Sequence, residues 1–293
     1  MMKKLAPFLI LLSGCLWGSM GLFVRNLTQA GLSSLEIVAL RAFITTVLMA
    51  ITLLIIKRGM FRIRLKDVWC FLGTGIGSIL LFNYCYFTAI NITSLSVAAV
   101  LLYTAPGFVM VMSYFLFKEK MNGRKILALA LTFVGCVLVT GVLGTGDILS
   151  LRGILMGLGA GFGYALYSIF SRYALERGYS SLTITFYTFL IASFGIIPMV
   201  SLSSIGTYLT GGVGNIFFVI AFGLVSTVFP YLAYTLGLEY VENGRASIIA
   251  SVEPVVATLF GVFVFREKLT LMNLLGMILV LGAIVLCNTK RKE

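Results

Sequence analysis

The sequence predicts an all-α polytopic membrane protein with ten transmembrane helices, arranged as two inverted five-helix repeats. Three observations lead to this prediction. Hydrophobic residues make up 60% of the 293-residue chain and charged residues only 11%, whereas soluble domains carry about 25% charged residues. Apolar stretches long enough to cross a bilayer follow one another with short polar connections. One of these stretches also occurs a second time, in similar form, later in the chain.

The duplicated stretch covers residues 98–120 and 246–268. The first copy reads AAVLLYTAPGFVMVMSYFLFKEK and the second reads ASIIASVEPVVATLFGVFVFREK. With an offset of 148, Pro106 falls on Pro254, and the charged triplet that closes the first copy falls on the triplet that closes the second. Self-similarity at half the chain length predicts two related domains. We assign residues 1–144 to the first repeat and residues 145–293 to the second.

The apolar segments share a length of about twenty residues and contain few charges. They are 5–25, 35–56, 67–90, 94–117, 122–141, 151–174, 181–202, 213–239, 244–265 and 270–288. Each is predicted to be helical, because backbone exposed to lipid must be hydrogen-bonded within its own segment. The longest linkers, 57–66 and 203–212, are too short to form a separate domain.

The first segment also resembles a bacterial lipoprotein signal, because Lys3 and Lys4 precede an apolar run that ends at Cys15. However, residues 14–25 have a counterpart inside the chain at residues 161–172. A cleaved peptide has no reason to recur within the mature sequence. We therefore predict an uncleaved first helix.

Lysine and arginine are distributed unevenly between the two sides of the predicted bundle. Of the 22 such residues, 17 fall on the side that carries both termini and four on the other side, while Arg41 lies within a segment. Cytoplasmic loops carry this excess, so we predict a multi-pass protein of the cytoplasmic (plasma) membrane with both termini cytoplasmic. Five helices per repeat is an odd number, so the second repeat enters the membrane from the opposite side.

The composition also argues against several other classes. The chain has no histidine, and its five cysteines show no metal or redox spacing, so we expect no metal, no cofactor and no enzymatic activity. The net charge of +12 is accounted for by the topology of the loops, and nucleic acid is not an expected partner. A nucleotide-binding G-x-x-x-x-G-K-[ST] stretch is absent from the sequence, so direct coupling to ATP is not expected.

Glu253 is the most informative single residue, because it lies near the middle of the predicted helix 244–265. A carboxylate at the bilayer centre is costly and indicates function. Pro254 bends the helix and frees a backbone carbonyl beside it. We predict that Glu253 either binds the cationic part of a solute or exchanges protons. The alternative is a hydrogen-bonded or protonated packing residue.

Arg41 and a set of polar and aromatic residues accompany Glu253. Arg41 can pair with Glu253 or with a substrate carboxylate, or its side chain can extend outward to the interface. The other cavity candidates are Pro106, Trp17, Asn83, Tyr86, Tyr103, Tyr164, Tyr167 and Tyr234. For the aromatic residues the alternative is an ordinary belt at the membrane interface.

Glycines spaced four residues apart predict close helix packing. They occur as Gly14 and Gly18, and as Gly153, Gly157 and Gly161. Because bulk at these positions matters more than polarity, Gly157→Leu is expected to impair folding or transport and Gly157→Ala to be mild.

The chain resembles the ten-helix EamA-type members of the drug/metabolite transporter superfamily over essentially its whole length. The resemblance rests on LLYTAPGFVMVMSYFLFKEK and on ASVEPVVATLFGVFVFREKLT, in which Glu253-Pro254 precedes Arg266-Glu267-Lys268; Trp17-Gly18 fits the first helix. It implies ten helices, cytoplasmic termini, a central cavity between the repeats, and export or exchange of amino acids or other small metabolites. The first copy lacks an acid before Pro106, so no symmetric carboxylate pair is implied.

We therefore expect a secondary transporter that carries a small-molecule solute by alternating access, surrounded by membrane lipid. The sequence does not indicate an oligomeric state. A channel is one alternative, although it would need a selectivity constriction that the sequence does not show. A lipid scramblase or flippase with the same inverted-repeat fold is another. An intramembrane enzyme would need a nucleophile–base pair or a metal site, and the sequence offers neither.

Overall fold

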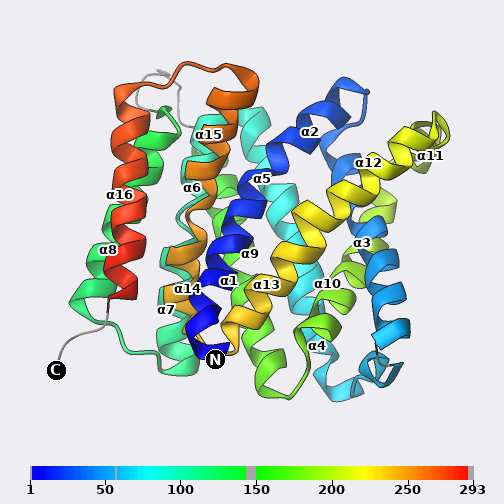
Figure 1. The fold of residues 1–293 in the computed structure, drawn as a ribbon, viewed down its shortest axis with the longest axis horizontal. Coiled ribbons are helices and arrows are strands. Elements are labelled where there is room, and N and C mark those ends of the chain that lie inside the picture. The colour runs from blue at the N-terminus through cyan, green and yellow to red at the C-terminus, as the bar shows by residue number, and fades with distance from the viewer. Residues whose placement is uncertain (1, 57, 143–149, 290–293) are drawn as a thin grey trace.

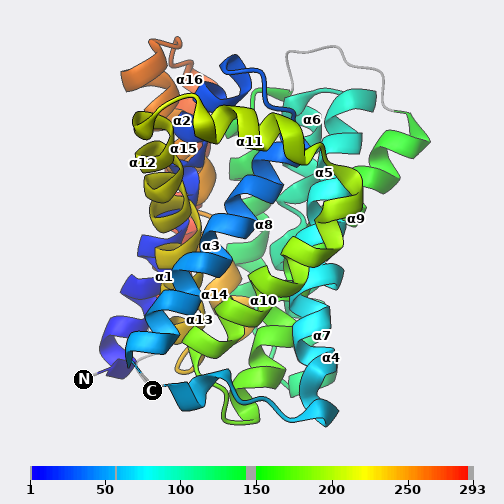
Figure 2. The same ribbon diagram turned by 90° about the vertical axis from the view of Figure 1, so that its right-hand side faces the viewer.

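In this computed structural model, residues 2–56, 58–142 and 150–289 are described, and their long segments are helical (Figures 1 and 2). The helices of the first repeat are α1 (Met2–Gly18), α2 (Met20–Gln29), α3 (Ser34–Ile56), α4 (Val68–Leu72), α5 (Leu81–Ile92), α6 (Leu95–Leu102), α7 (Ala105–Phe117) and α8 (Gly123–Val139). Those of the second are α9 (Leu151–Glu176), α10 (Ser181–Ile196), α11 (Leu202–Thr210), α12 (Val213–Gly223), α13 (Phe229–Leu238), α14 (Asn243–Ala250), α15 (Glu253–Phe265) and α16 (Leu271–Asn288). The predicted boundary between residues 144 and 145 lies outside the described residues.

The predicted membrane-spanning segments are present as helices. Within the described part of the chain, nine helical segments are long and apolar enough to cross a bilayer. The tenth predicted segment, 122–141, is α8, whose 17 residues stand at the short end of the range for a spanning helix. Two of the spans contain a π-helical stretch, Gly73–Leu80 before α5 and Leu224–Val228 before α13.

The second long linker is more ordered than the sequence suggested. Residues 203–212 were predicted to be a plain connection, but most of them belong to α11. Its apolar residues Ile205, Tyr208 and Leu209 recur at helical spacing and pack against the cluster around α3 and α12. Burial of that apolar face explains why the linker is helical.

The two repeats run in opposite directions across the bundle. Helices α6 and α14 begin and end 148 residues apart, and so do α7 and α15. The C-caps Lys118 and Arg266 both adopt the left-handed conformation, with φ of 54° and 56°. In Figure 1, however, α7 runs toward the face where both chain ends lie, and α15 runs away from it. We call the first the terminal face, with residues 118–122 and 239–242, and the other the opposite face, with residues 93–94 and 266–270.

Equivalent residues of the two repeats meet in the middle of the bundle. Trp17 and Tyr164, which match at an offset of 147, have ring centroids 6.2 Å apart. Thr46 and Ser193, which match at the same offset, have their hydroxyl oxygens 3.1 Å apart. Symmetry-related groups can touch only beside the axis that relates them. The pseudo-two-fold axis therefore passes through the centre of the bundle, where inverted-repeat transporters place their sites.

Glycines hold each repeat against the other. A Cβ added to Gly18 would lie 2.6 Å from the carbonyl oxygen of Glu253, and one added to Gly14 would lie 2.7 Å from that of Ala250. In the second repeat, a Cβ on Gly161 would lie 2.9 Å from the carbonyl oxygen of Leu101. The first helix of each repeat thus touches backbone of the other repeat, where only glycine fits.

Gly157 gives a test of this packing. An added Cβ would lie 2.6 Å from Leu101 Cβ, so Gly157→Leu should destabilise the protein strongly. The structure also revises the expectation for alanine: Gly157→Ala should destabilise by about 1–3 kcal/mol through overpacking. Thermal unfolding in detergent measures both variants. Gly214→Ala is the control, because a Cβ there meets open space, and equal melting temperatures for Gly157→Ala and the control would contradict the packing.

Candidate functional site

Two membrane spans are interrupted near the centre of the bundle. Helix α14 ends at Ala250 and α15 begins at Glu253, while in the first repeat the same break separates α6 from α7. Pro254 and Pro106 stand in the first turn of the helix after each break. Proline is tolerated there because its missing N–H is not needed, but it cannot continue a preceding helix. Discontinuous helices of this kind form the central sites of transporters.

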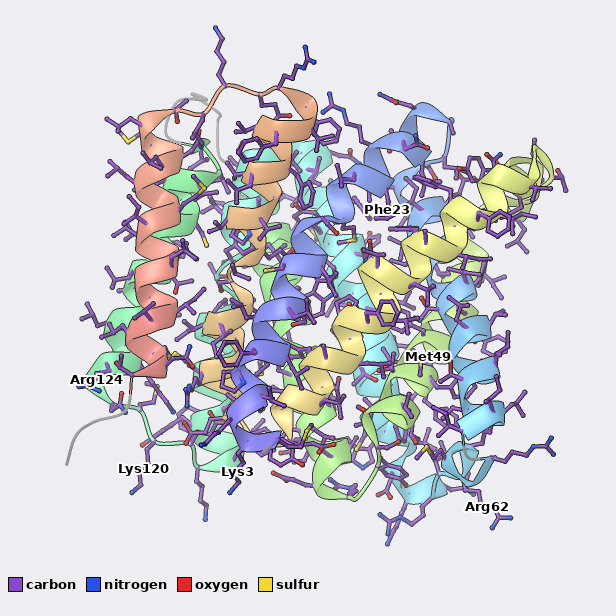
Figure 3. All side chains as sticks on the ribbon, in the orientation of Figure 1. Lys3, Phe23, Met49, Arg62, Lys120 and Arg124 are labelled. Atoms are coloured by element: carbon purple, nitrogen blue, oxygen red, sulfur yellow. The ribbon has the colours of Figure 1, made fainter. Side chains whose placement is uncertain are left out.

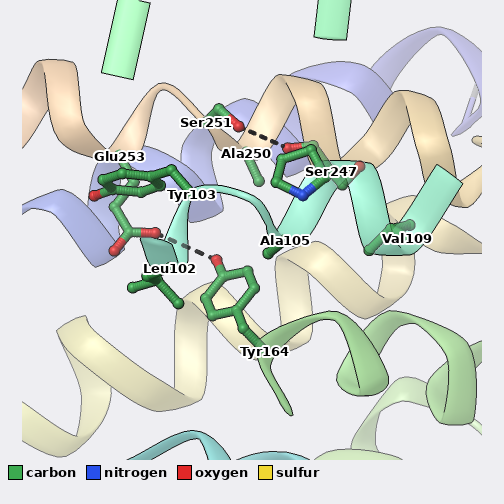
Figure 4. Close-up of a pocket in the computed structure, with 10 residues that line it drawn as sticks. Leu102, Tyr103, Ala105, Val109, Tyr164, Ser247, Ala250, Ser251 and Glu253 are labelled. Carbon is green, nitrogen blue, oxygen red and sulfur yellow. Dashed lines mark hydrogen bonds between the residues drawn. The ribbon is translucent and has the colours of Figure 1, made fainter. Parts of the chain in front are cut away.

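The first central cavity lies between the two breaks (Figure 4). Its volume is ≈ 20 Å³, about the space of one water molecule. It is lined by Leu102, Tyr103, Ala105, Pro106 and Val109 of the first repeat and by Tyr164, Ser247, Ala250, Ser251 and Glu253 of the second. The Tyr164 hydroxyl donates a hydrogen bond to Glu253 Oε2 at 3.3 Å, and Ser251 Oγ donates to the Ser247 carbonyl oxygen at 3.1 Å.

A second cavity of ≈ 20 Å³ lies on the other side of Tyr164. It is lined by Trp17, Ser78, Ile79, Phe82, Tyr164, Tyr167, Ser168, Tyr231 and Tyr234. Trp17 packs edge-on against Tyr231, with ring centroids 5.2 Å apart. The hydroxyl oxygens of Ser168 and Tyr234 are 2.7 Å apart and hydrogen-bonded. Hydroxyl groups and aromatic rings therefore line this second cavity.

Two opposite charges lie in this interior without pairing directly. Glu253 is the first residue of α15, where the positive end of the helix dipole stabilises a carboxylate. Arg41 is only 4% exposed, so it does not extend to the surface, and its Nη1 donates to the sulfur of Met20 at 2.9 Å. Among the described residues, no ion pair joins either side chain to a group of opposite charge. Ionisable side chains inside a membrane protein are costly, so both residues are candidates for a binding role.

The structure brings most of the predicted site residues to the two cavities. Those that line a cavity are Glu253, Pro106, Tyr103, Trp17, Tyr164, Tyr167 and Tyr234. Pro254, Arg41, Asn83 and Tyr86 line neither cavity. Asn83 donates from Nδ2 to the Ile79 carbonyl oxygen of its own helix, at 2.7 Å. Tyr86 stacks on Phe82, with ring centroids 5.7 Å apart.

Several lining residues were not predicted as site residues. Ser247 and Ser251 stand one helical turn apart just before Glu253, and that spacing is a signal that would have placed both hydroxyls on one face. Phe82, Leu102 and Val109 are ordinary apolar residues of membrane helices. Their place at the cavities depends on packing that no local pattern reveals.

A comparison with known families matches the chain twice. The model of the EamA-like transporter family fits residues 4–141 and residues 151–289. The chain belongs to the EamA-like transporter family. This confirms the resemblance to EamA-type members of the drug/metabolite transporter superfamily and the two-repeat helical fold.

Individual proteins agree with this membership. The chain is 31% identical over 281 residues to an uncharacterized transporter of Archaeoglobus fulgidus, covering 94% of both chains. It is 24% identical over 296 residues to the uncharacterized transporter YxxF of Bacillus subtilis, covering 99% of this chain and 91% of that one. A solved crystal structure superposes with a TM-score of 0.78 at 16% identity, over 97% of this chain and 96% of that one. Together with the apolar helices, these likenesses make the chain a multi-pass membrane protein of a small-molecule transporter family.

Proposed function

We propose that this EamA-family protein is a secondary transporter that exports or exchanges amino acids or other small metabolites across the cytoplasmic membrane by alternating access. The observation that carries the proposal is the position of Glu253. Its carboxylate stands at the break of a membrane-spanning helix, in a cavity to which both repeats contribute. A group on the axis between inverted repeats can be reached in turn from either side of the membrane.

The two interior charges suit a zwitterionic solute. The Glu253 carboxylate can accept hydrogen bonds from an ammonium group, and the Arg41 guanidinium can donate two parallel hydrogen bonds to a carboxylate. Among the described residues the two side chains form no ion pair, and of the two only Glu253 lines a cavity. The ring of Tyr164, which lies beside the carboxylate, and that of Trp17 in the neighbouring cavity favour a solute with apolar parts.

A thermal-shift screen of the purified protein tests this substrate class. A ligand that binds only the folded state at about a hundred times its Kd adds ~2.7 kcal/mol to the free energy of unfolding, or roughly 5–10 °C in melting temperature. Amino acids are compared with their N-acetyl derivatives and methyl esters, which lack one of the two charges. We expect only the zwitterions to shift the melting temperature fully. If the N-acetyl derivative and the methyl ester both shift it as much as the amino acid does, recognition of two charges is contradicted.

A lateral hollow favours lipid scrambling as a second candidate function. It has a volume of ≈ 490 Å³ and is lined by Thr104, Gly107, Phe108, Met110, Val111, Met121, Ile126 and Leu129. Thr104 and Gly107 flank Ala105 and Pro106 of the central cavity. An acyl chain can therefore lie beside the site. Movement of fluorescent phospholipid between leaflets of proteoliposomes, at a rate above that of protein-free vesicles, would support this alternative.

We expect the terminal face to be cytoplasmic. Side chains of Lys3, Arg62 and Lys120 point outward from that face, and Arg124 lies near the same end of the bundle (Figure 3); cytoplasmic loops carry most of the positive charge. In a chain without native cysteines, a cysteine at Leu269, 44% exposed, should react with an impermeant reagent added outside cells. A cysteine at Met121, 43% exposed, should be protected. The reverse pattern would invert the topology.

A further inference from the structure

The two repeats end α7 and α15 in the same way. The Glu119 amide donates to the Ser113 carbonyl oxygen at 3.2 Å, and the Glu267 amide donates to the Gly261 carbonyl oxygen at 3.0 Å. In both cases the preceding residue is left-handed. The backbone around the two glutamates, 148 residues apart, is therefore equivalent. Differences in their side-chain contacts arise from how the repeats are arranged and not from the local chain.

At the terminal face, Glu119 binds the beginning of α14. Its Oε1 accepts a hydrogen bond from the Asn243 amide at 2.7 Å, and its Oε2 accepts one from the Gly244 amide at 3.1 Å. A carboxylate on the first amides of a helix is favoured both by the hydrogen bonds and by the helix dipole. Because Glu119 belongs to the first repeat and α14 to the second, these bonds join the repeats. We call this pair of bonds the terminal latch.

Two further contacts accompany the terminal latch. Arg172 donates to the carbonyl oxygens of Leu238, at 2.7 Å, and Val241, at 3.0 Å, and so holds the end of α13 just before α14. A Cβ on Gly244 would lie 2.9 Å from Met110 Cγ, so α7 and α14 are in close contact where the latch forms. The terminal face is thus closed between these two helices.

At the opposite face the equivalent contacts are absent from the described residues. By symmetry, Glu267 would bind the amides of Leu95 and Ser96 at the beginning of α6. Instead its side chain is 62% exposed and lies 3.6 Å from Arg25 Nη1, an exposed ion pair that contributes little. Helix α15 packs against α1 rather than against α6. Helices α15 and α6 lie apart at the upper end of Figure 2. The pseudo-symmetry is therefore broken at Glu119 and Glu267, because only Glu119 binds the beginning of a helix in the other repeat.

A buried amide lies beside the terminal latch. The Asn243 side chain is fully buried, and neither its amide nitrogen nor its oxygen has a hydrogen-bond partner in the described structure. An unsatisfied buried amide destabilises the state that contains it. Water that enters when α14 moves away from α7 would satisfy both atoms.

We propose that Glu119, which binds the beginning of α14, and Glu267, which would bind the beginning of α6, form alternating latches. Which of the two latches is made decides which face of the central site is open. In the present arrangement the terminal latch is made. In the alternate state the terminal latch is broken, and Glu267 binds the amides of Leu95 and Ser96. The inference rests on the proposed function, because it specifies how access to the same site is switched. The ≈ 20 Å³ cavities are too small for an amino acid, so a change of arrangement is needed for a solute to enter.

Distances between spin labels in the reconstituted full chain test the proposal. One pair of labels replaces Met121 and Tyr240 across the terminal face, and the other replaces Leu269 and Leu95 across the opposite face; all four side chains are exposed. Glu119→Gln removes the charge from the terminal latch. It should raise the ratio of open to closed terminal face by about ten-fold and shorten the distance across the opposite face. Glu267→Gln should lower the ratio of open to closed terminal face and lengthen the distance across the opposite face.

Gly244→Val is a variant that changes no charge. Its side chain would separate α14 from α7, so it should shift the populations in the same direction as Glu119→Gln. The proposal is overturned if both glutamine variants leave the distance distributions unchanged, or if they shift them in the same direction. Transport by the wild-type chain is measured separately. Transport with unchanged label distances would refute the latches alone, whereas opposite shifts without transport of any small solute would refute the proposed function alone.

Discussion

Replacing Glu253 with glutamine should reduce solute transport by at least about a hundred-fold, equivalent to the loss of ~2.7 kcal/mol of binding, while the chain still folds and inserts. Glutamine keeps the shape of the side chain and still accepts the hydrogen bond that Tyr164 donates at 3.3 Å. It removes the negative charge that faces the cavity at the start of α15. Because a hydrogen bond to a charged group contributes more than one between neutral groups, a solute ammonium would lose most of its stabilisation.

Two further variants separate this role from packing. Glu253→Ala removes both shape and charge and should also abolish transport. Tyr164→Phe keeps the carboxylate and removes only its hydrogen-bond donor, so transport should fall just a few-fold. Uptake in proteoliposomes and thermal unfolding are measured for all three. Full activity of Glu253→Gln, with Glu253→Ala reduced only in melting temperature, would identify Glu253 as a packing residue.

Arg41→Gln is expected to weaken the transport of carboxylate-bearing solutes by about ten- to a hundred-fold in KM. Arg41 is buried, and within the described part of the chain its side chain donates one hydrogen bond, to the sulfur of Met20, a weak acceptor. A charged hydrogen bond to a solute carboxylate contributes ~1.5–3 kcal/mol, which sets this range. The same change should leave the KM of a methyl ester of that solute within a few-fold of its wild-type value.

A comparison of solutes distinguishes binding by Arg41 from a structural role. If Arg41 only stabilises the bundle, Arg41→Gln should lower transport of the amino acid and of its ester equally. Met20→Leu is a matched control, because it removes the sulfur acceptor and keeps an apolar side chain of similar size. It should leave discrimination between the acid and the ester unchanged. Equal losses for both solutes in Arg41→Gln would remove Arg41 from the binding site.

Most of the fold prediction rests on the internal repeat, because a constant offset between two matching stretches predicts the same local structure at each matched position. Pro106 and Pro254, 148 residues apart, predicted equivalent bends, and the structure has helix breaks of identical extent before them. Depth in an apolar segment placed Glu253 in the interior, and it lines the central cavity. Both features follow from local sequence and membrane thickness alone.

Other features depend on contacts between distant segments. Asn83 is deep and polar, but its amide bonds its own helix, and sequence depth does not distinguish the two sides of a helix. The triplets at 118–120 and 266–268 are nearly identical in sequence, yet Glu119 binds α14 whereas Glu267 lies beside Arg25. That difference depends on which face is closed. The small volume of the cavities is likewise determined by how the helices are arranged and cannot be deduced from the identity of the residues that line them.

Solute counterflow into proteoliposomes distinguishes alternating access through the Glu253 site from other routes of solute movement. Vesicles that contain the purified chain are preloaded with an unlabelled amino acid found by thermal shift, and uptake of a labelled trace of the same compound is followed. We expect saturable uptake that rises transiently above equilibrium, is stimulated by solute on the far side and is absent in Glu253→Gln. Flux that increases linearly with concentration and shows no trans-stimulation, or counterflow that Glu253→Gln supports at the wild-type rate, would contradict transport through this site by alternating access.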